Sequence, residues 1–288
     1  LLPAPAWVET GTFLPADTDA VLAPDAVTMN AGGAEAVAAA VPGEGVQPAL
    51  ADAAANFVLR RAGERLRRTD VAILRAAGLS RVHVRVPHVR VALANAIAES
   101  KDTISPLVGG SIEAAGGTAV FDRAMPLERA LTDGVDVVIG IGGTGMGRGD
   151  TSVQTLARLG RVAVHGVAIS PGDTAALGDA DGRAVLLLPG RLDAALAVLL
   201  VIGRPLLARL AGADEDEPGS LVTLKRKIAS PIGLAEVVPV RRVEGGVEPL
   251  ASGPIPWHAL TRADGWILVP AESEGFPAGG RVEMRVLP

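Results

Sequence analysis

The sequence predicts an α/β protein in which a doubly wound parallel sheet forms the central domain, with a β-rich domain before it and a small β domain after it. Strand patterns and helical patterns alternate between residues 88 and 213, which is typical of repeated βα units. One unit carries a glycine-rich loop between its strand and its helix. After residue 218 apolar residues alternate with charged ones, as in antiparallel strands.

Composition along the chain sets the expected domain limits. Glycines and prolines interrupt short apolar runs in the first part, which indicates strands and turns. The acidic stretch at 214–219 is typical of a solvated linker, with a cation site as the alternative. We expect a β-rich domain at 1–61, a linking helix and strand at 62–87, the α/β domain at 88–213 and a β domain at 218–288.

Two of the outer segments carry local signals. Thr69 or Asp70 is expected to cap a helix that ends at Gly78, and the alternation at 82–86 predicts a half-exposed strand. The basic run Lys-Arg-Lys at 225–227 is expected to be a strand edge that its charge keeps soluble. A contact to the ligand of a neighbouring subunit is the alternative for this run.

Apolar runs define the strands of the central domain, and apolar residues at helical spacing define its helices. The expected strands are Val89–Leu93, Thr118–Phe121, Val135–Ile141, Val162–Ile169 and Val185–Leu188. The expected helices are Pro106–Ala115, Leu127–Leu131, Thr151–Leu159 and Leu192–Leu210.

The stretch from Gly134 to Asp150 is the centre of the functional prediction. An apolar strand leads into a glycine-rich loop, and a helix follows. Helix N-termini have unpaired N–H groups and glycines admit a ligand close to the backbone, so this arrangement suits a phosphate. A tight structural connection is the alternative. The glycine spacing at 140–145 also permits a dinucleotide site, but the strand at 162–169 ends without the acidic residue that binds a ribose.

Asp150 is the candidate catalytic and metal-binding residue. A carboxylate at the end of a phosphate loop can hold Mg²⁺ and so bridge the protein to ligand oxygens. Capping of the next helix is the alternative role, and the two roles can coexist. The four histidines, His83, His88, His165 and His258, lack the spacing of a zinc site and are expected to be surface or satisfied structural residues.

Composition argues against several classes of protein. Aromatic residues make up 2% of the chain and its net charge is −5, both of which argue against nucleic-acid binding. Without cysteine there is no disulfide or thiolate, which fits a cytoplasmic protein. The most apolar region, 186–202, is interrupted and too short to span a membrane.

Several short motifs, taken together, resemble those of one known family. They read Gly-Gly-Thr-Gly at 142–145, Gly-Asp-Thr at 149–151, Pro-Gly at 171–172, Leu-Pro-Gly at 188–190, Thr-Gly at 10–11, Leu-Pro at 14–15, Ala-Asp-Gly-Trp-Ile at 263–267 and Ala-Gly-Gly-Arg-Val at 278–282. Their order is similar to that in MoeA-type molybdopterin molybdenumtransferases, the family that includes the gephyrin E domain. The chain is identified as a divergent member of this family that lacks the usual N-terminal segment.

The resemblance implies a function and a site. The family binds molybdopterin or its adenylated form and inserts molybdate with the help of Mg²⁺, so Asp150 is expected to be catalytic and to hold Mg²⁺. A homodimer is implied, in which the C-terminal β domain faces the partner's pterin site, and a molybdenum enzyme is the expected recipient. The expected ligand-binding residues are Gly142, Gly143, Thr144, Gly145, Arg148, Thr151, Asp102, Thr103, Ser170, Pro171, Gly172, Pro189, Gly190 and Arg191.

The chain also departs from the family pattern. Residues 96–99 stand where the family has Thr-Gly-Asp-Glu, and Ile104 stands at the asparagine of the family's Asp-Thr-Asn. Ser170 and Asp173 stand at the two lysines of the family's Lys-Pro-Gly-Lys-Pro, and Arg191 stands at the asparagine of its Pro-Gly-Asn-Pro. A hydrogen bond to a charged group contributes roughly 1.5–3 kcal/mol, so two lost lysine contacts weaken binding roughly a hundredfold to ten-thousandfold. Arg148 and Arg191 are expected to compensate in part.

We therefore predict a MoeA-type protein of molybdenum cofactor biosynthesis that binds the pterin ligand and has weak or no molybdate-inserting activity. A non-catalytic molybdopterin binder or assembly partner is one alternative. A dinucleotide-dependent enzyme is the other.

Overall fold

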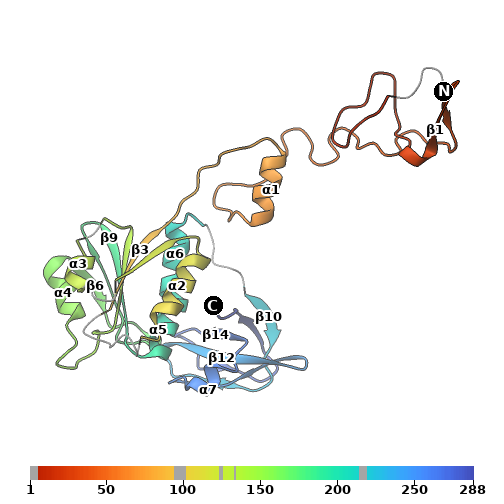
Figure 1. The fold of residues 1–288 in the computed structure, drawn as a ribbon. Helices are drawn as coiled ribbons and strands as arrows, with labels where there is room; N and C mark the ends of the chain where they lie inside the picture. Colours follow the sequence, from red (N-terminus) through yellow and green to blue (C-terminus); the bar gives the residue numbers. More distant parts are fainter. Residues whose placement is uncertain (1–5, 94–101, 123–125, 133, 214–218) are drawn as a thin grey trace. The chain divides into compact units, whose positions relative to one another are not determined.

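The computed structural model describes residues 6–93, 102–122, 126–132, 134–213 and 219–288 (Figure 1). The chain forms two compact units, Leu1–Leu59 and Arg60–Pro288. The described part of the first unit, residues 6–59, contains one 3₁₀ turn, Pro24–Ala26, and one antiparallel hairpin formed by β1, Val27–Asn30, and β2, Gly33–Ala36. The regular β structure of the N-terminal region is this hairpin.

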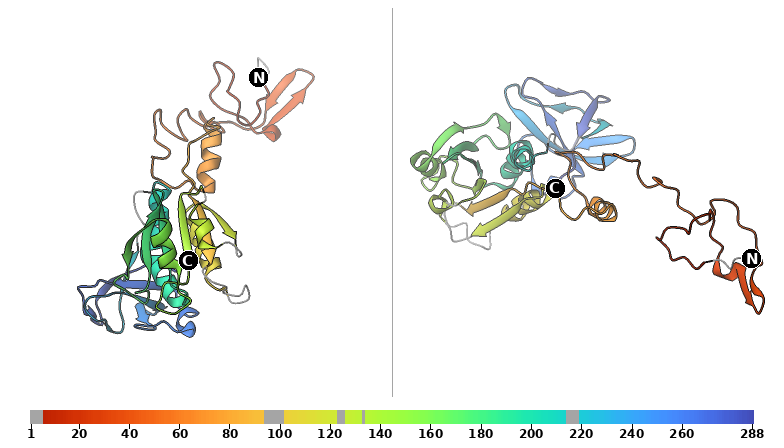
Figure 2. Two further views of the ribbon diagram at one scale, coloured as in Figure 1. Left: turned by 90° about the vertical axis from the view of Figure 1, so that its left-hand side faces the viewer. Right: turned by 90° about the horizontal axis from the view of Figure 1, so that it is seen from above.

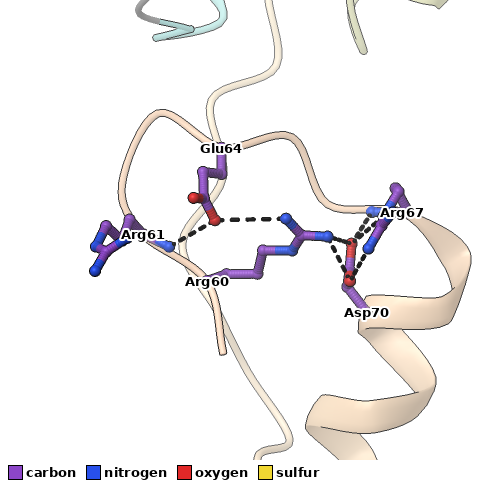
Figure 3. A network of polar contacts seen from close by, with 5 residues as sticks. All are labelled: Arg60, Arg61, Glu64, Arg67 and Asp70. Atoms are coloured by element: carbon purple, nitrogen blue, oxygen red, sulfur yellow. Dashed lines mark hydrogen bonds and ion pairs between the residues drawn. The ribbon is translucent and has the colours of Figure 1, made fainter. Parts of the chain in front are cut away.

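Helix α1, Arg68–Ala76, begins with a cluster of charged side chains (Figure 3). Arg67 takes the N-cap position, so the predicted cap at Thr69 or Asp70 is wrong by two or three residues. Asp70 instead lies within the first turn and accepts a hydrogen bond of 2.8 Å from the N–H of Arg67. The guanidinium of Arg60 reaches both oxygens of the same carboxylate at 2.8 Å. Asp70 therefore joins the helix start to the preceding chain.

The Asp70 carboxylate makes this helix start sensitive to acid. Hydrogen bonds from the side chains of Arg67 and Arg60, and from the N–H of Arg67, hold the pKa of Asp70 far below its ordinary value of 3.8. A lowered folded-state pKa contributes stability above the unfolded-state value, and that contribution is lost as the pH falls below about 4.

We expect Asp70→Asn to reduce the hydrogen-exchange protection of α1 amides at pH 7, because the variant loses the charged acceptor. The difference in α1 amide protection between the variant and the unsubstituted chain should stay constant down to about pH 5 and shrink below about pH 4. A difference that persists unchanged at about pH 3 would contradict this assignment.

The end of α1 follows the prediction, and the next segment does not. Gly78 adopts a left-handed φ of 80°, and the N–H of Leu79 bonds to the carbonyl of Leu74, which closes the helix. Residues 82–86 form no strand, because no described strand pairs with their backbone. The alternating pattern there leaves its valines exposed.

The central domain contains a six-stranded sheet in the order β4-β3-β5-β9-β8-β6. The strands are β3, His88–Leu93; β4, Thr118–Asp122; β5, Val137–Ile141; β6, Arg161–His165; β8, Ala176–Ala180; and β9, Arg183–Leu188. β4, β3, β5 and β9 are parallel neighbours, as predicted. The α/β class is thus confirmed, with a parallel sheet that carries two further strands at one edge.

The edge of this sheet corrects two expectations. β8 is antiparallel to β9, because Asp181 and Gly182 both have positive φ angles and make a tight two-residue hairpin turn. β8 also pairs in antiparallel with β6. The strand predicted at Val162–Ile169 ends at His165, since Gly166 turns the chain with a φ of 84°. The remainder forms a separate strand, β7, Ile169–Ser170.

Helices cover both faces of the sheet, as Figures 1 and 2 show. α2, Ser105–Ala114, packs on one face with the last helical stretch, while α3, Leu127–Ala130, and α4, Ser152–Leu159, pack on the other. That last stretch consists of α5, Leu192–Val198, a π-helical segment, Leu199–Gly203, and α6, Arg204–Leu210. The π segment precedes Pro205, which has no N–H for a helical hydrogen bond. Across the described ranges, no helix is both long and apolar enough to cross a membrane.

The C-terminal domain is the predicted small antiparallel β domain. Its elements are β10, Ser220–Thr223; β11, Ile228–Ala229; β12, Ala235–Val243; β13, Gly246–Pro249; α7, Trp257–Leu260; β14, Gly265–Val269; β15, Gly275–Phe276; and β16, Arg281–Met284. β12 pairs with β13 and β14, and also with β7 of the preceding domain. Residues 225–227 form an exposed bend between β10 and β11, so the predicted strand edge is wrong there.

The two domains of the second unit share a core. Buried Trp266 of β14 packs with Ile255 and Val237 against Leu196 and Leu200 of the helical stretch. In Figure 2 this helical stretch lies between the central sheet and the C-terminal β domain. The C-terminal domain is therefore packed directly beside the helix that starts at the carboxyl edge of the sheet.

Candidate functional site

Two loops lie side by side where β5 and β9 end. The strands pair in parallel with Ile141 opposite Leu188, and the N–H of Gly142 donates to the carbonyl of Leu188 at 2.8 Å. A Cβ on Gly190 would lie 3.5 Å from the Cα of Gly142, so the Pro-Gly turn after β9 contacts the glycine loop after β5. The structure therefore brings together two of the segments that the sequence predicts for ligand binding.

The loop begins with two glycines whose backbone conformation other residues rarely adopt. Gly142 and Gly143 have φ angles of 85° and 70°, which side-chain-bearing residues rarely adopt. Buried Ser152 then ties the loop to α4, because its Oγ donates to the carbonyl of Gly142 at 2.9 Å and its N–H donates to that of Gly143 at 3.0 Å. The sequence prediction missed Ser152, although its place at the helix start was visible.

Asp150 closes the loop on itself. Its Oδ2 accepts a hydrogen bond of 2.7 Å from the N–H of Gly147, and its own N–H donates to the carbonyl of Gly147 at 3.0 Å. Thr151 takes the N-cap position of α4, without a capping hydrogen bond from its side chain, so the alternative role of Asp150 as the helix cap is wrong. The carboxylate points back into the loop because the glycines around it leave room.

Glycines line the Asp150 carboxylate on two sides. A Cβ added at Gly145 or at Gly147 would lie 2.8 Å from Asp150 Oδ2, whereas one added at Gly149 would meet nothing within 4 Å. The place that Asp150 Oδ2 occupies is therefore available only because residues 145 and 147 carry no side chain. Arg148 and Met146 on the same loop are exposed.

Thr144 links the loop to the strands at the sheet edge. Its side chain is buried and shares a hydrogen bond of 3.2 Å with the hydroxyl of Thr174, while His165 Nε2 donates to its carbonyl at 3.1 Å. His165 is thus a satisfied structural residue, one of the roles predicted for it. Its place beside the loop was not predicted, because the bend at Gly166 decides it.

The segment 170–174 reaches the glycine loop only through Thr174, as far as the described hydrogen bonds extend. Ser170 belongs to β7 and pairs with Glu236 of β12. A Cβ on Gly172 would lie 2.6 Å from Val198 Cγ2, so this glycine permits close packing against α5. The described contacts of this segment are structural. A ligand-binding role stays a prediction for Ser170, Pro171 and Gly172.

Asp102 has a structural role at the start of α2. Its Oδ1 accepts hydrogen bonds from the N–H groups of Ile104 and Ser105 at 3.2 and 3.0 Å. Ile104 is buried in the core of the sheet, which explains how an apolar residue is accommodated after Asp102 and Thr103. The replaced segment 96–99 lies outside the described residues.

Arg191 stands at the second loop. Its Nη2 donates to Asp193 Oδ2 at 2.8 Å, and the side chain of Arg191 is 68% exposed while that of Asp193 is 8% exposed. Among the described residues, no group of three or more His, Asp or Glu side chains is placed to hold a metal ion. Asp150 fits Mg²⁺ only if a ligand supplies further oxygens, which is how Mg²⁺ commonly binds beside phosphates.

Comparison with known proteins identifies the class of this fold. Residues 93–209 match the family model described as "Probable molybdopterin binding domain", and residues 222–287 match the model of the MoeA C-terminal region, domain IV. The first match contains both loops, and the second contains most of the small β domain. The chain is therefore a protein of the molybdopterin-binding-domain class, and it belongs to the MoeA-type family.

Individual relatives support the same assignment. A Methanocaldococcus jannaschii protein assigned to molybdopterin biosynthesis is 33% identical over 165 residues, which cover 56% of this chain and 38% of that protein. The molybdopterin molybdenumtransferase of Haemophilus influenzae is 24% identical over 232 residues, which cover 72% of this chain and 56% of the relative. The chain thus spans less than two thirds of either relative.

A solved structure agrees over most of the chain. The molybdopterin biosynthesis MoeA protein of Pyrococcus horikoshii superposes with a TM-score of 0.71 at 27% identity, covering 96% of this chain and 73% of that one. This similarity confirms the predicted fold class, with a central α/β domain and a small C-terminal β domain.

Proposed function

We propose that this protein acts in molybdenum cofactor biosynthesis by binding molybdopterin or adenylated molybdopterin at the edge formed by the loop 142–150 and the turn 189–191. The observation that carries the proposal is the contact between these loops at the ends of neighbouring parallel strands, with the Asp150 carboxylate turned into the first loop. Ligands of such sheets bind beyond the carboxyl ends of the strands.

The residues of the two loops suit a phosphorylated ligand. Gly143 and Gly145 carry no side chain, so phosphate oxygens can approach their backbone N–H groups. Arg148 and Arg191 supply positive charge that can grip phosphate with two nitrogens. Asp150 would hold Mg²⁺ together with ligand oxygens, and the bound ion would neutralise phosphate charge.

Molybdate insertion is proposed to be weak. Ser170 and Asp173 stand at the family's two lysine positions, and Asp173 adds a negative charge. The loss of two charged contacts removes roughly 3–6 kcal/mol of binding free energy. A helix terminus contributes only about 0.3–2 kcal/mol and cannot replace them. The homodimer, the molybdenum-enzyme recipient and the cytoplasmic location stay predictions from family resemblance and composition.

Isothermal titration with molybdopterin, adenylated molybdopterin and NAD tests the ligand. We expect binding of at least one pterin and none of NAD. Tight binding of NAD alone would instead support the dinucleotide-dependent alternative.

Reconstitution of a molybdenum enzyme from adenylated molybdopterin and molybdate tests the activity. We expect little turnover from the unsubstituted chain, and weaker Mg²⁺-dependent pterin binding from Asp150→Asn. Robust turnover that Asp150→Asn abolishes would restore a full transferase. Pterin binding that the substitution leaves unchanged would reduce Asp150 to a structural residue of the loop.

A further inference from the structure

A buried carboxylate holds Arg191 at the edge of the site. Asp193 lies in the first turn of α5, and its Oδ2 accepts hydrogen bonds from Arg191 Nη2 at 2.8 Å and from the N–H of Ile255 at 3.1 Å. Burying a carboxylate is unfavourable unless charge and hydrogen bonds compensate it. Arg191 supplies that charge, so the two side chains stabilise each other's position.

The geometry leaves part of the Arg191 guanidinium for another partner. The group has five N–H donors in a rigid fork, and within the described chain Asp193 is its one hydrogen-bond partner. Arg191 directly follows Gly190, which contacts Gly142. A phosphate or similar oxyanion on the glycine loop would therefore lie near an arginine whose orientation is already set.

The same carboxylate connects the site to the C-terminal domain. Ile255 precedes α7 and belongs to the core that α5 shares with the β domain. Because one oxygen of Asp193 serves both Arg191 and Ile255, the position of the arginine depends on the packing of the C-terminal domain. This dependence requires only contacts within one chain.

We infer that Asp193 is a positioning residue that orients Arg191 toward an anionic group of the ligand bound by the loop 142–145. The inference rests on the proposed function. It assigns the binding contact to Arg191 and an indirect role to Asp193, which is buried and has no ligand-facing role of its own. Pre-orienting a long side chain lowers the entropy that binding would otherwise lose.

A double-mutant cycle in the full chain tests this inference, with molybdopterin as the titrated probe. Arg191→Gln is expected to weaken binding roughly tenfold to a hundredfold, as for one hydrogen bond to a charged group. Asp193→Asn, which keeps an oxygen for the N–H of Ile255, is expected to cause part of that loss. The double variant should bind like Arg191→Gln alone, because Asp193 acts through the arginine.

Controls separate positioning from general destabilisation. Asp179→Asn is the matched control, because Asp179 pairs with exposed Arg161 at 2.7 Å on strands outside the two loops, and it should leave the affinity unchanged. Arg191→Lys should bind nearly as weakly as Arg191→Gln, since lysine lacks the rigid fork. This last variant leaves Asp193 intact and tests the inference even if Asp193→Asn fails to fold.

The outcomes distinguish the inference from the proposed function. An unsubstituted chain that binds no molybdopterin would overturn both. A chain that binds it, but with additive losses from Arg191→Gln and Asp193→Asn, would overturn the positioning role alone. Full affinity in Arg191→Lys would also overturn it.

Discussion

Gly147→Ala is expected to weaken Mg²⁺-dependent binding of molybdopterin about a hundredfold, while Gly149→Ala is expected to leave it unchanged. The new methyl group at 147 would lie 2.8 Å from Asp150 Oδ2, so the carboxylate must move. The fold should persist, because the displaced atom belongs to a side chain that can rotate. A displacement of about 1 Å at a group that must be precisely placed is sufficient for an effect of this size.

The two substitutions form a matched pair. Both lie in the same loop and add the same methyl group, and neither glycine has a left-handed backbone. Gly145→Ala should behave like Gly147→Ala, since its methyl group would meet the same oxygen at 2.8 Å. Titration of molybdopterin with and without Mg²⁺ measures the effect. Equal affinities for Gly147→Ala and Gly149→Ala would show that the position of the Asp150 carboxylate does not matter for binding.

Gly178→Ala is expected to lower the free energy of unfolding by about 3 kcal/mol, the upper part of the range for overpacked cores. Gly178 lies in β8 between two neighbouring strands, and a Cβ there would lie 2.1 Å from the carbonyl oxygen of Arg161. The obstructing atom is backbone, so no side-chain rotation relieves the contact. The strand pairing itself must shift.

Gly110→Ala, in the same domain, is expected to raise the free energy of unfolding. This glycine is exposed inside α2, and a Cβ there would meet nothing within 4 Å. Replacing a helical glycine by alanine should stabilise the chain by about 0.5–1 kcal/mol. Urea denaturation followed by circular dichroism, and by the fluorescence of buried Trp266, measures both variants. A neutral Gly178→Ala would show that β6 and β8 can separate without loss of the fold.

Much of the central domain could be predicted from the sequence, because buried parallel strands and amphipathic helices have strong local patterns. The strand that became β5, the helix α2 and the long helical stretch from Leu192 all appear near their expected places. The β8–β9 hairpin was missed although its turn, Asp-Gly at 181–182, is a strong hairpin signal. The strand expected at 82–86 was wrong because alternation alone does not supply a pairing partner.

The candidate site was only half visible in the sequence. Glycine spacing marked the loop and its acidic end, since both depend on local backbone freedom. The contacts that hold the site were not visible, because Thr174 and His165 reach Thr144 from other elements and Asp193 accepts from the N–H of Ile255, 62 residues further along the chain. β7 illustrates the same limit: two residues pair with β12, and so short a strand has no pattern of its own.

By itself, then, the sequence determined most of the strands and helices in the α/β domain, the glycine loop and the family resemblance, because each depends on neighbouring residues. Only the tertiary structure decided that the loops after β5 and β9 touch, that Asp150 turns into its own loop and that Asp193 joins Arg191 to the C-terminal domain. These contacts depend on which strands lie side by side and on where a buried carboxylate finds its donors. Both are settled when distant parts of the chain pack together.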